Sequence, residues 1–271
     1  MFKTFSCKIL ATAGSLLLLL SFWGCSAGPQ TVRSTSSQPI SKQVLDGIEW
    51  RNTVIASYAT RGELIIRVQG TEYRGRHTVA AIPPDYFFVQ ISTPSNQPIL
   101  TISGNEKVVT KIDFRTGLYS RSQLRDGEFN LTDAVWLTTD FFTYFPVGNV
   151  RMMENPTIRE IKRPQENETE FIINERGVSQ NIQYLTTTQE PPYLVKDVEL
   201  KTLDYLDYSA RFRQYKLFED TYIPLSVYIR IPGKNVEVSF RNEQFMLNPP
   251  LTPEQFDVKP PSYFREEKAR K

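Results

Sequence analysis

Catalytic chemistry at a histidine would have to use His77, the single histidine among the 271 residues. A Ser-His-Asp triad, a Cys-His dyad or a zinc site with several histidines each requires at least one such side chain. His77 lies in RGRHTVA, which we interpret as the middle of a β-strand, so we expect an ordinary strand residue. Neither G-x-G-x-x-G nor G-x-x-x-x-G-K-[ST] occurs. The sequence therefore predicts no catalytic residue, no metal and no cofactor.

Two aspartates three residues apart, Asp204 and Asp207 in LDYLDY, are the other candidates for acid–base chemistry. A glycosidase needs only two carboxylates that are suitably separated in space. Neighbouring acids in a sequence more often form a solvated surface, and we favour that interpretation here. We therefore expect that the protein is not an enzyme.

The residue best placed for covalent chemistry is Cys25, which closes an apolar N-terminal segment. Two lysines precede the apolar residues 9–23, which are shorter than the roughly twenty residues of a membrane span and fit a secretory signal. The junction FWGC at residues 22–25 resembles the lipobox of bacterial lipoproteins, in which a small residue precedes a cysteine that becomes acylated. We expect residues 1–24 to be removed as a lipoprotein signal peptide. A plain signal peptide and an uncleaved anchor are the alternatives.

The cysteine count agrees with attachment at Cys25. The only other cysteine, Cys7, lies inside the segment that would be removed, so the mature chain would have no intramolecular disulfide. Acyl chains such as palmitate on Cys25 would hold the protein at a membrane, since two chains give stable anchoring. Ser26 follows the cysteine. By resemblance to enteric lipoproteins, a residue other than aspartate there implies the outer membrane, facing the periplasm.

The charge of the mature chain argues against nucleic-acid binding. Removing residues 1–24 takes away two of the 32 basic residues and none of the 30 acidic ones, which leaves 30 of each. A nucleic-acid-binding domain usually carries a clear basic excess. We therefore expect contact with the membrane only through the N-terminal acyl anchor.

Composition divides the rest of the chain into three parts. Residues 25–41 are rich in Ser, Thr, Pro and Gly and are predicted to be a flexible tether. Residues 42–262 are long enough for one β-rich domain. Residues 263–271 end in REEKARK, a tail of mixed charge that we expect to be frayed.

Alternating apolar residues predict many short strands in that domain. Leu64, Ile66 and Val68 share one face of RGELIIRVQG, and Glu63 and Arg67 share the other. Similar patterns predict strands in residues 77–82, 85–92, 98–104, 106–114, 116–122, 157–163, 168–174, 180–187, 193–202, 209–218, 222–231 and 235–245. The last two alternate most regularly.

Two segments have helical spacing instead. Val44, Ile48, Ile55 and Tyr58 recur near the 3.6-residue period, with Ser41 as a candidate N-cap. Residues 131–145, LTDAVWLTTDFFTYF, are predicted to form a second, aromatic-rich helix that ends at Pro146. The strands and helices together predict a mainly β fold, built as one strongly curved antiparallel sheet or barrel.

The order of these elements resembles the LolA/LolB-like superfamily of bacterial envelope lipoproteins. The signals are RGELIIRVQG, IPPDYFFVQISTP, the aromatic segment leading to PVG, and QFMLNPPLTPEQFDV near the end. The resemblance implies a strongly curved antiparallel half-open barrel, with helices packed in its concave side as a lid. The receptor member of that family exposes a leucine in a Pro-Leu-Gly turn; here Ser95 stands in the corresponding loop, residues 93–98.

In that family the apolar concave side receives acyl chains, so the resemblance implies a carrier or receptor for a hydrophobic ligand. The ligand would be a lipid or the acyl chain of a lipoprotein cargo, in envelope transport or sorting. The residues that would line the cavity, and the aromatic residues that would cover it, are Leu64, Ile66, Val68, Phe87, Val89, Ile91, Trp136, Phe141, Phe142, Phe145, Leu225, Val227 and Ile229. The aromatic residues among them are equally suited to ordinary core packing.

A second interpretation is a tethered interaction or assembly factor of an envelope complex, with a protein partner and no lipid-carrier role. A fully packed barrel would suit that function better than a container. Exposed strand edges and the loop 94–98 would then contact the partner.

The lipobox resemblance predicts that Cys25→Ser releases the protein from membranes. Without the thiol there is no thioether for the acyl chains that hold the mature protein. Fractionation in detergent-free buffer, with the wild-type chain as reference, measures the change. A serine variant that stays with the membrane fraction would contradict lipid anchoring at this residue.

Overall fold

The computed structural model describes residues 38–125, 127–132, 135–152, 157–165, 168–175, 178–186, 193–202 and 205–267. All of them belong to one compact unit, residues 31–271. The predicted signal peptide, Cys25 and the tether up to residue 37 lie outside the described residues. No helix in the described part is long and apolar enough to cross a membrane.

Most described residues belong to strands. The helices are α1 (Gln38–Val54) and α2 (Asp140–Thr143), with 3-10 turns η1 (Phe145–Val147), η2 (Pro232–Lys234) and η3 (Pro253–Phe256). The strands are β1 (Tyr58–Val68), β2 (Thr71–Ile82), β3 (Tyr86–Ser92), β4 (Pro98–Gly104), β5 (Val108–Asp113), β6 (Leu118–Gln123), β7 (Glu128–Thr132), β8 (Val135–Thr138), β9 (Thr157–Gln165), β10 (Glu168–Glu175), β11 (Val178–Thr186), β12 (Tyr193–Thr202), β13 (Tyr205–Phe218), β14 (Thr221–Ile231), β15 (Val236–Leu247) and β16 (Arg265–Glu266).

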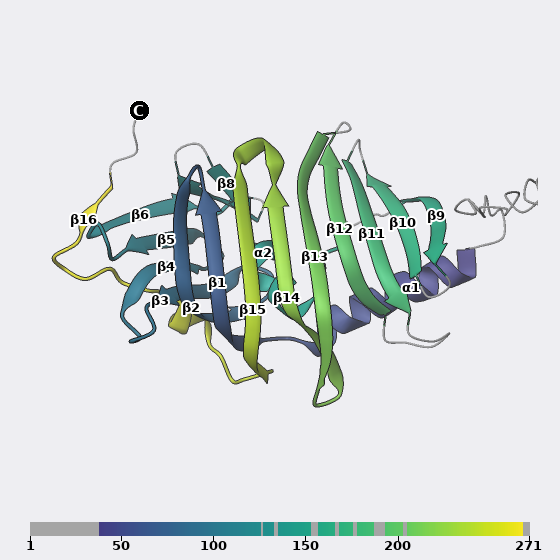
Figure 1. The fold of residues 1–271 in the computed structure, drawn as a ribbon, viewed down its shortest axis with the longest axis horizontal. Helices are drawn as coiled ribbons and strands as arrows, with labels where there is room; N and C mark the ends of the chain where they lie inside the picture. The colour runs from purple at the N-terminus through teal and green to yellow at the C-terminus, as the bar shows by residue number, and fades with distance from the viewer. Residues whose placement is uncertain are drawn as a thin grey trace, which may run out of the picture. The chain divides into compact units, whose positions relative to one another are not determined.

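Fourteen of these strands form a single open sheet, in the order β16-β6-β5-β4-β3-β2-β1-β15-β14-β13-β12-β11-β10-β9. Every neighbouring pair is antiparallel except β16 and β6. A twisted sheet with more than about ten strands curls, and Figure 1 shows this sheet curving from β6 to β9. The prediction of a mainly β, curved antiparallel sheet is confirmed.

The concave side of the sheet carries the core. The alternation of β1 puts Leu64, Ile66 and Val68 inward, opposite Phe240, Val238 and Val236 of β15. A separate insert crosses this side. Its described residues, 127–132 and 135–150, form β7, β8, α2 and η1, of which Figure 1 labels β8 and α2. Within the insert, α2 contacts β2 and β3, and η1 contacts β14. The insert and the inward faces of the strands therefore share one core.

The predicted helix over residues 131–145 is wrong. Strands β7 and β8 pair with each other, with Phe129 opposite Leu137, and of the described residues in this segment only Asp140–Thr143 is α-helical. Buried residues recur at every second position through Val135, Leu137 and Thr139, and the residues of α2 that follow are all buried. Over so short a run, an alternation with a period of two also matches part of a helical pattern, so a helix could be predicted in error. Val and Thr, which favour strands, agree with the hairpin that forms. The cover on the concave side therefore combines the β7–β8 hairpin, α2 and a 3-10 turn with helix α1, whose Ile48 belongs to the same core cluster.

Both ends of the domain also differ from the sequence-based prediction. Helix α1 begins at Gln38, before the expected cap at Ser41, and Tyr58 is the first residue of β1 rather than part of the helix. In the tail expected to be frayed, Arg265 and Glu266 pair with Leu118 and Tyr119 of β6. Backbone hydrogen bonds to an open sheet edge order this part of the tail.

The ladder between β1 and β15 has a bulge at Gly62, where the partner changes from Gln244 to Asn242. A Cβ at residue 62 would lie 1.9 Å from the carbonyl oxygen of Arg241 and 2.9 Å from the His77 ring. Neither neighbour can move aside easily, because one is ladder backbone and the other is buried. Glycine at this position therefore lets β1 and β15 approach each other closely.

We predict that Gly62→Ala lowers the free energy of unfolding by roughly 1–3 kcal/mol or more, the usual range for overpacking. Gly233→Ala is the matched control, since nothing lies within 4 Å of a Cβ added in the β14–β15 turn. Urea unfolding of residues 31–271 measures both. Equal stability of the two variants would contradict the close approach at the bulge.

Candidate functional site

The aromatic residues of the insert lie at the centre of the core. Phe142 stacks on Phe87 with ring centroids 5.5 Å apart, and Phe141 meets the Tyr208 ring at 5.2 Å. Phe145 packs edge-to-face on Phe212 at 5.6 Å. These three phenylalanines are at most 1% exposed. Their packing is that of core residues.

Four side chains from the surrounding elements hold the backbone of the insert. Tyr58 donates to the carbonyl oxygen of Phe142, Asn242 to Pro146 at 2.9 Å, Arg51 to Val147 at 2.9 Å, and Asn52 to Val150 at 2.8 Å. Irregular backbone that is buried must find such partners, because it has no ladder or helix to satisfy it. Residues 142–150 are therefore fixed to α1, β1 and β15.

Most of the residues predicted to bind the ligand are buried in this core. Leu64, Ile66, Val68, Phe87, Val89, Ile91, Phe141, Phe142, Phe145, Val227 and Ile229 belong to one hydrophobic cluster. Leu225 is only partly buried and packs against the cluster. The side chain of Trp136, on β8, lies outside the described part.

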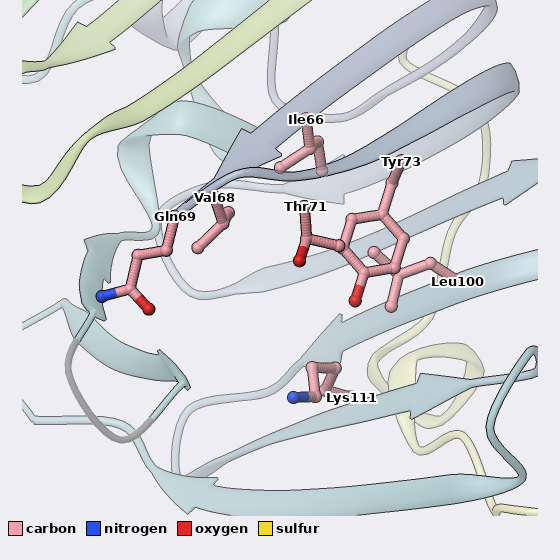
Figure 2. A pocket seen from close by; sticks show the side chains of 7 residues that line it. All are labelled: Ile66, Val68, Gln69, Thr71, Tyr73, Leu100 and Lys111. Carbon is pink, nitrogen blue, oxygen red and sulfur yellow. The ribbon is translucent and has the colours of Figure 1, made fainter.

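Two of the predicted residues, Ile66 and Val68, also line a cavity of about 140 Å³. Its other lining residues are Gln69, Thr71, Tyr73, Leu100 and Lys111 (Figure 2). Ile66, Val68 and Leu100 supply apolar surface, while Gln69 and Thr71 are exposed at the β1–β2 turn. The cavity therefore joins an apolar wall to an exposed polar turn.

The residues predicted to line the site did not include Tyr73, Leu100 or Lys111. The strand pairing places all three inward: Tyr73 is opposite Ile66, Leu100 is opposite Ile91, and Lys111 is opposite Ile102. A signal for these residues was present in the sequence. Once the inward faces of β1 and β3 are known, the alternation along β2, β4 and β5 indicates which of their side chains also point inward. Lys111 was missed because a cation interrupts an apolar pattern.

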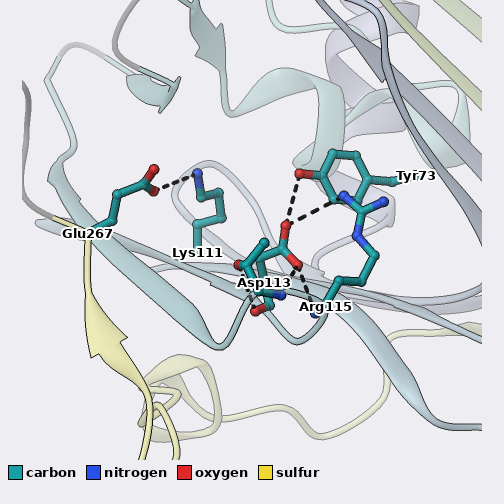
Figure 3. Close-up of polar contacts among 6 residues, drawn as sticks. Tyr73, Lys111, Asp113, Arg115 and Glu267 are labelled. Atoms are coloured by element: carbon teal, nitrogen blue, oxygen red, sulfur yellow. Dashed lines mark hydrogen bonds and ion pairs between the residues drawn. The ribbon is translucent and has the colours of Figure 1, made fainter.

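Polar contacts surround the cavity on the side of β5. The Lys111 ammonium lies 3.3 Å from a carboxylate oxygen of Glu267. Tyr73 donates to Asp113 at 3.1 Å, and the Arg115 guanidinium lies 3.5 Å from the same carboxylate and 4.0 Å from the centre of the Tyr73 ring (Figure 3). Burial, followed by the Asp113 charge, raises the pKa of Tyr73. This phenol is therefore a neutral hydrogen-bond donor at ordinary pH.

The residues first considered for catalysis lie elsewhere. His77 is on β2, 2% exposed, with its ring edge-to-face on Phe240 at 5.8 Å and no hydrogen-bond partner for either ring nitrogen among the described residues. Burial lowers the pKa of His77 to about 4, so the ring is neutral near pH 7. Asp207 accepts a hydrogen bond from Thr202 at 2.6 Å, and Asp204 lies outside the described residues. In the described ranges, no cluster of three His, Cys, Asp or Glu residues could hold a metal ion.

The loop carrying Ser95 is a tight exposed turn. The Thr93 amide donates to Gln97 at 2.8 Å, the Asn96 amide donates to Thr93 at 2.9 Å, and the hydroxyls of Thr93 and Ser95 are 2.9 Å apart. Residues 94–97 are exposed and contribute no large apolar side chain. This turn differs in that respect from the leucine-bearing turn of the receptor.

Asp140, the first residue of α2, is buried with its Oδ1 atom lacking a hydrogen-bond partner among the described residues. Burial raises the pKa of Asp140 to about 6, although the Arg151 charge acts in the opposite direction and Asp85 adds to the increase. A folded-state pKa above the unfolded value means that protonation favours the folded state. Asp140 therefore destabilises the fold progressively as the pH rises from about 4 to 6.

We predict that Asp140→Asn stabilises residues 31–271 more at pH 7 than at pH 4. The difference should be on the order of 2–3 kcal/mol, because each unit of pKa shift corresponds to about 1.4 kcal/mol. Guanidinium unfolding of both proteins at the two pH values measures it, and the pH 4 comparison controls for the change of side chain. The same difference in stability at pH 4 and pH 7 would show that the carboxyl does not titrate in this range.

No family model matches the sequence, and no curated protein shows significant sequence similarity. Solved structures do match. A LolA superfamily protein from Nitrosomonas europaea is 11% identical with a TM-score of 0.53, over 79% of this chain and 97% of that one.

Two further solved structures match to the same degree. A putative outer membrane lipoprotein-sorting protein domain from Vibrio parahaemolyticus is 8% identical with a TM-score of 0.54, over 79% of this chain and 95% of its own. A DUF1329 family protein from Desulfovibrio piger is 9% identical with a TM-score of 0.52, over 79% of this chain and 97% of its own. At such identities the likeness concerns the fold alone. The resemblance predicted from the sequence is confirmed at that level: the chain has the fold of the LolA superfamily.

Proposed function

We propose that this protein is a non-enzymatic envelope lipoprotein that binds a hydrophobic ligand on the concave side of its sheet. The observation that carries the proposal is the cavity between β1, β2, β4 and β5, with Ile66, Val68 and Leu100 as its apolar wall. Cys25 would hold the domain at the outer membrane, facing the periplasm. The ligand would be a lipid or the acyl chain of a lipoprotein, in envelope transport or sorting.

The size of the cavity limits what it takes up. About 140 Å³ is close to the volume of an engineered protein cavity that binds benzene. This space accepts the end of a chain, and each buried CH₂ group contributes about 0.8 kcal/mol. Because residues 142–150 are held by four side-chain hydrogen bonds, the part of the concave side beneath them is closed to a ligand. Binding is therefore proposed at the β1–β2 turn and not across the whole concave side.

Solved structures with this fold support the proposal. One of them is described as an outer membrane lipoprotein-sorting domain. A fold that presents one curved apolar face to a short insert suits the binding of chains, since the sheet stays in place while the ligand contacts the inward side chains. We extend the lipid-related function to this chain on that basis.

The alternative, a tethered assembly factor with a protein partner, is favoured by a different observation. Trp50, Leu217, Met246 and Tyr263 are each more than half exposed. Where exposed apolar side chains of this size form one contiguous patch, they mark a surface that binds partners. Crosslinking in intact cells would detect such a partner.

Native mass spectrometry of residues 31–271, produced in a bacterial periplasm, tests ligand binding directly. Residues 31–271 form one compact unit that contains the whole core cluster, so this part is suitable for the test. We expect a bound lipid in the wild-type protein and a lower bound fraction in Ile66→Phe, whose added ring occupies the cavity. Ile65→Phe makes the same change on the opposite face of β1 and should retain the lipid.

The result that would overturn the carrier proposal is a wild-type protein without bound lipid that also fails to take up added alkyl chains. One reproducible crosslinked protein, in the absence of lipid, would then support the assembly factor.

A further inference from the structure

Among the described residues that line the cavity, the charged side chain is that of Lys111 on β5. Its side chain is only 16% exposed, which is low for lysine. The neighbouring inward residues are Ile102 of β4 and Ser120 of β6, and neither carries a charge. The sheet therefore brings an ammonium group to the edge of an apolar space without placing an acid opposite it in the ladder.

The carboxylate that pairs with Lys111 comes from the C-terminal segment. Glu267 follows β16, and its amide donates to the Tyr119 carbonyl of β6 at 2.7 Å. This places its carboxylate 3.3 Å from the Lys111 ammonium, while the Glu267 side chain remains 49% exposed (Figure 3). A pair that is open to solvent on one side contributes little stability. An acid of another molecule can therefore replace Glu267 at small cost.

Another acid close to this cavity, Asp113, is already engaged. Its Oδ1 atom accepts the amides of Arg115 at 2.9 Å and Thr116 at 3.3 Å. Its Oδ2 atom accepts the Tyr73 hydroxyl and lies 3.5 Å from the Arg115 guanidinium. These contacts fix Asp113 within the β5–β6 turn. Glu267 is thus the exchangeable carboxylate beside the cavity.

We infer that the cavity binds an amphiphile with an apolar chain and an acidic end group, whose acidic group pairs with Lys111 in place of Glu267. This inference rests on the proposed function and adds the chemical class of the ligand. The chain end lies against Ile66, Val68 and Leu100, and the carboxylate meets the ammonium at the cavity edge (Figure 2). A chain with a neutral end group makes the apolar contacts but leaves Lys111 with Glu267.

Calorimetric titration of residues 31–271 with octanoate and with octanol tests this inference. The two probes share the chain and differ in charge. We expect the wild-type protein to bind octanoate more tightly than octanol. Lys111→Gln should weaken octanoate binding by about tenfold, which corresponds to about 1.4 kcal/mol. The affinity of the same variant for octanol should change by less than about twofold. Lys107→Gln, on the exposed β4–β5 turn, removes the same charge and should alter neither affinity.

Two further variants keep the test decisive if Lys111→Gln fails to fold. Lys111→Arg retains the charge and should retain the preference for octanoate. Glu267→Gln removes the competing carboxylate and should strengthen octanoate binding severalfold without affecting octanol. Added salt should weaken octanoate and not octanol, because the pair is partly exposed.

The outcomes separate the inference from the proposed function. Equal binding of octanoate and octanol, insensitive to Lys111 and Glu267, would overturn the acidic end group and leave the carrier function in place. Failure of both probes to bind the wild-type protein would overturn both. Octanoate binding that depends on Lys111 but is unchanged in Glu267→Gln would overturn the replacement of Glu267.

Discussion

The pairing of β1 with β15 is the constraint on which the rest of the structure depends. The two strands are far apart in the sequence, yet they pair from Tyr58 opposite Leu247 to Val68 opposite Val236. This ladder joins the meander β1–β6 to the meander β9–β15, and without it the chain would have two separate sheets. It also sets the inward register, because a slip of one residue would turn Leu64 and Ile66 to solvent. Gly62 permits the bulge that the ladder contains.

The insert covers the apolar face that the open sheet would otherwise expose to solvent. An apolar concave face must be covered, and a short irregular segment can cover it only if its own backbone polar groups find partners. Tyr58, Asn242, Arg51 and Asn52 supply these partners to residues 142–150. The same insert buries the carboxyl group of Asp140, which lowers the stability of the folded state by an amount that depends on pH. Cover and sheet are therefore one core, and the space left for a ligand is correspondingly small.

Because the space is small, few residues distinguish a lipid carrier from a fully packed assembly factor. Ordinary core packing accounts for Phe141, Phe142 and Phe145, so these residues do not distinguish a container from a packed scaffold. The distinction depends on the cavity beside the β1–β2 turn, where the apolar wall meets Lys111. The exposed Trp50, Leu217 and Met246 belong to other surfaces and bear on the scaffold alone.

The sequence by itself determined most strands of the large sheet, and the buried face of those that alternate regularly, as for Leu64, Phe87 and Val227, because a period of two depends only on neighbouring residues. It also supported the resemblance that the fold confirms. The prediction of a helix at residues 131–145 was wrong. Helical and alternating patterns overlap in a short aromatic run, and only the pairing of β7 with β8 selects between them. The sequence did not predict the site residues Lys111, Tyr73 and Glu267 for a related reason. Tyr73 and Lys111 are brought together by the register between strands, and Glu267 reaches them because a C-terminal strand adds to the sheet edge. Such contacts between distant residues are decided by tertiary structure, since no local spacing records them.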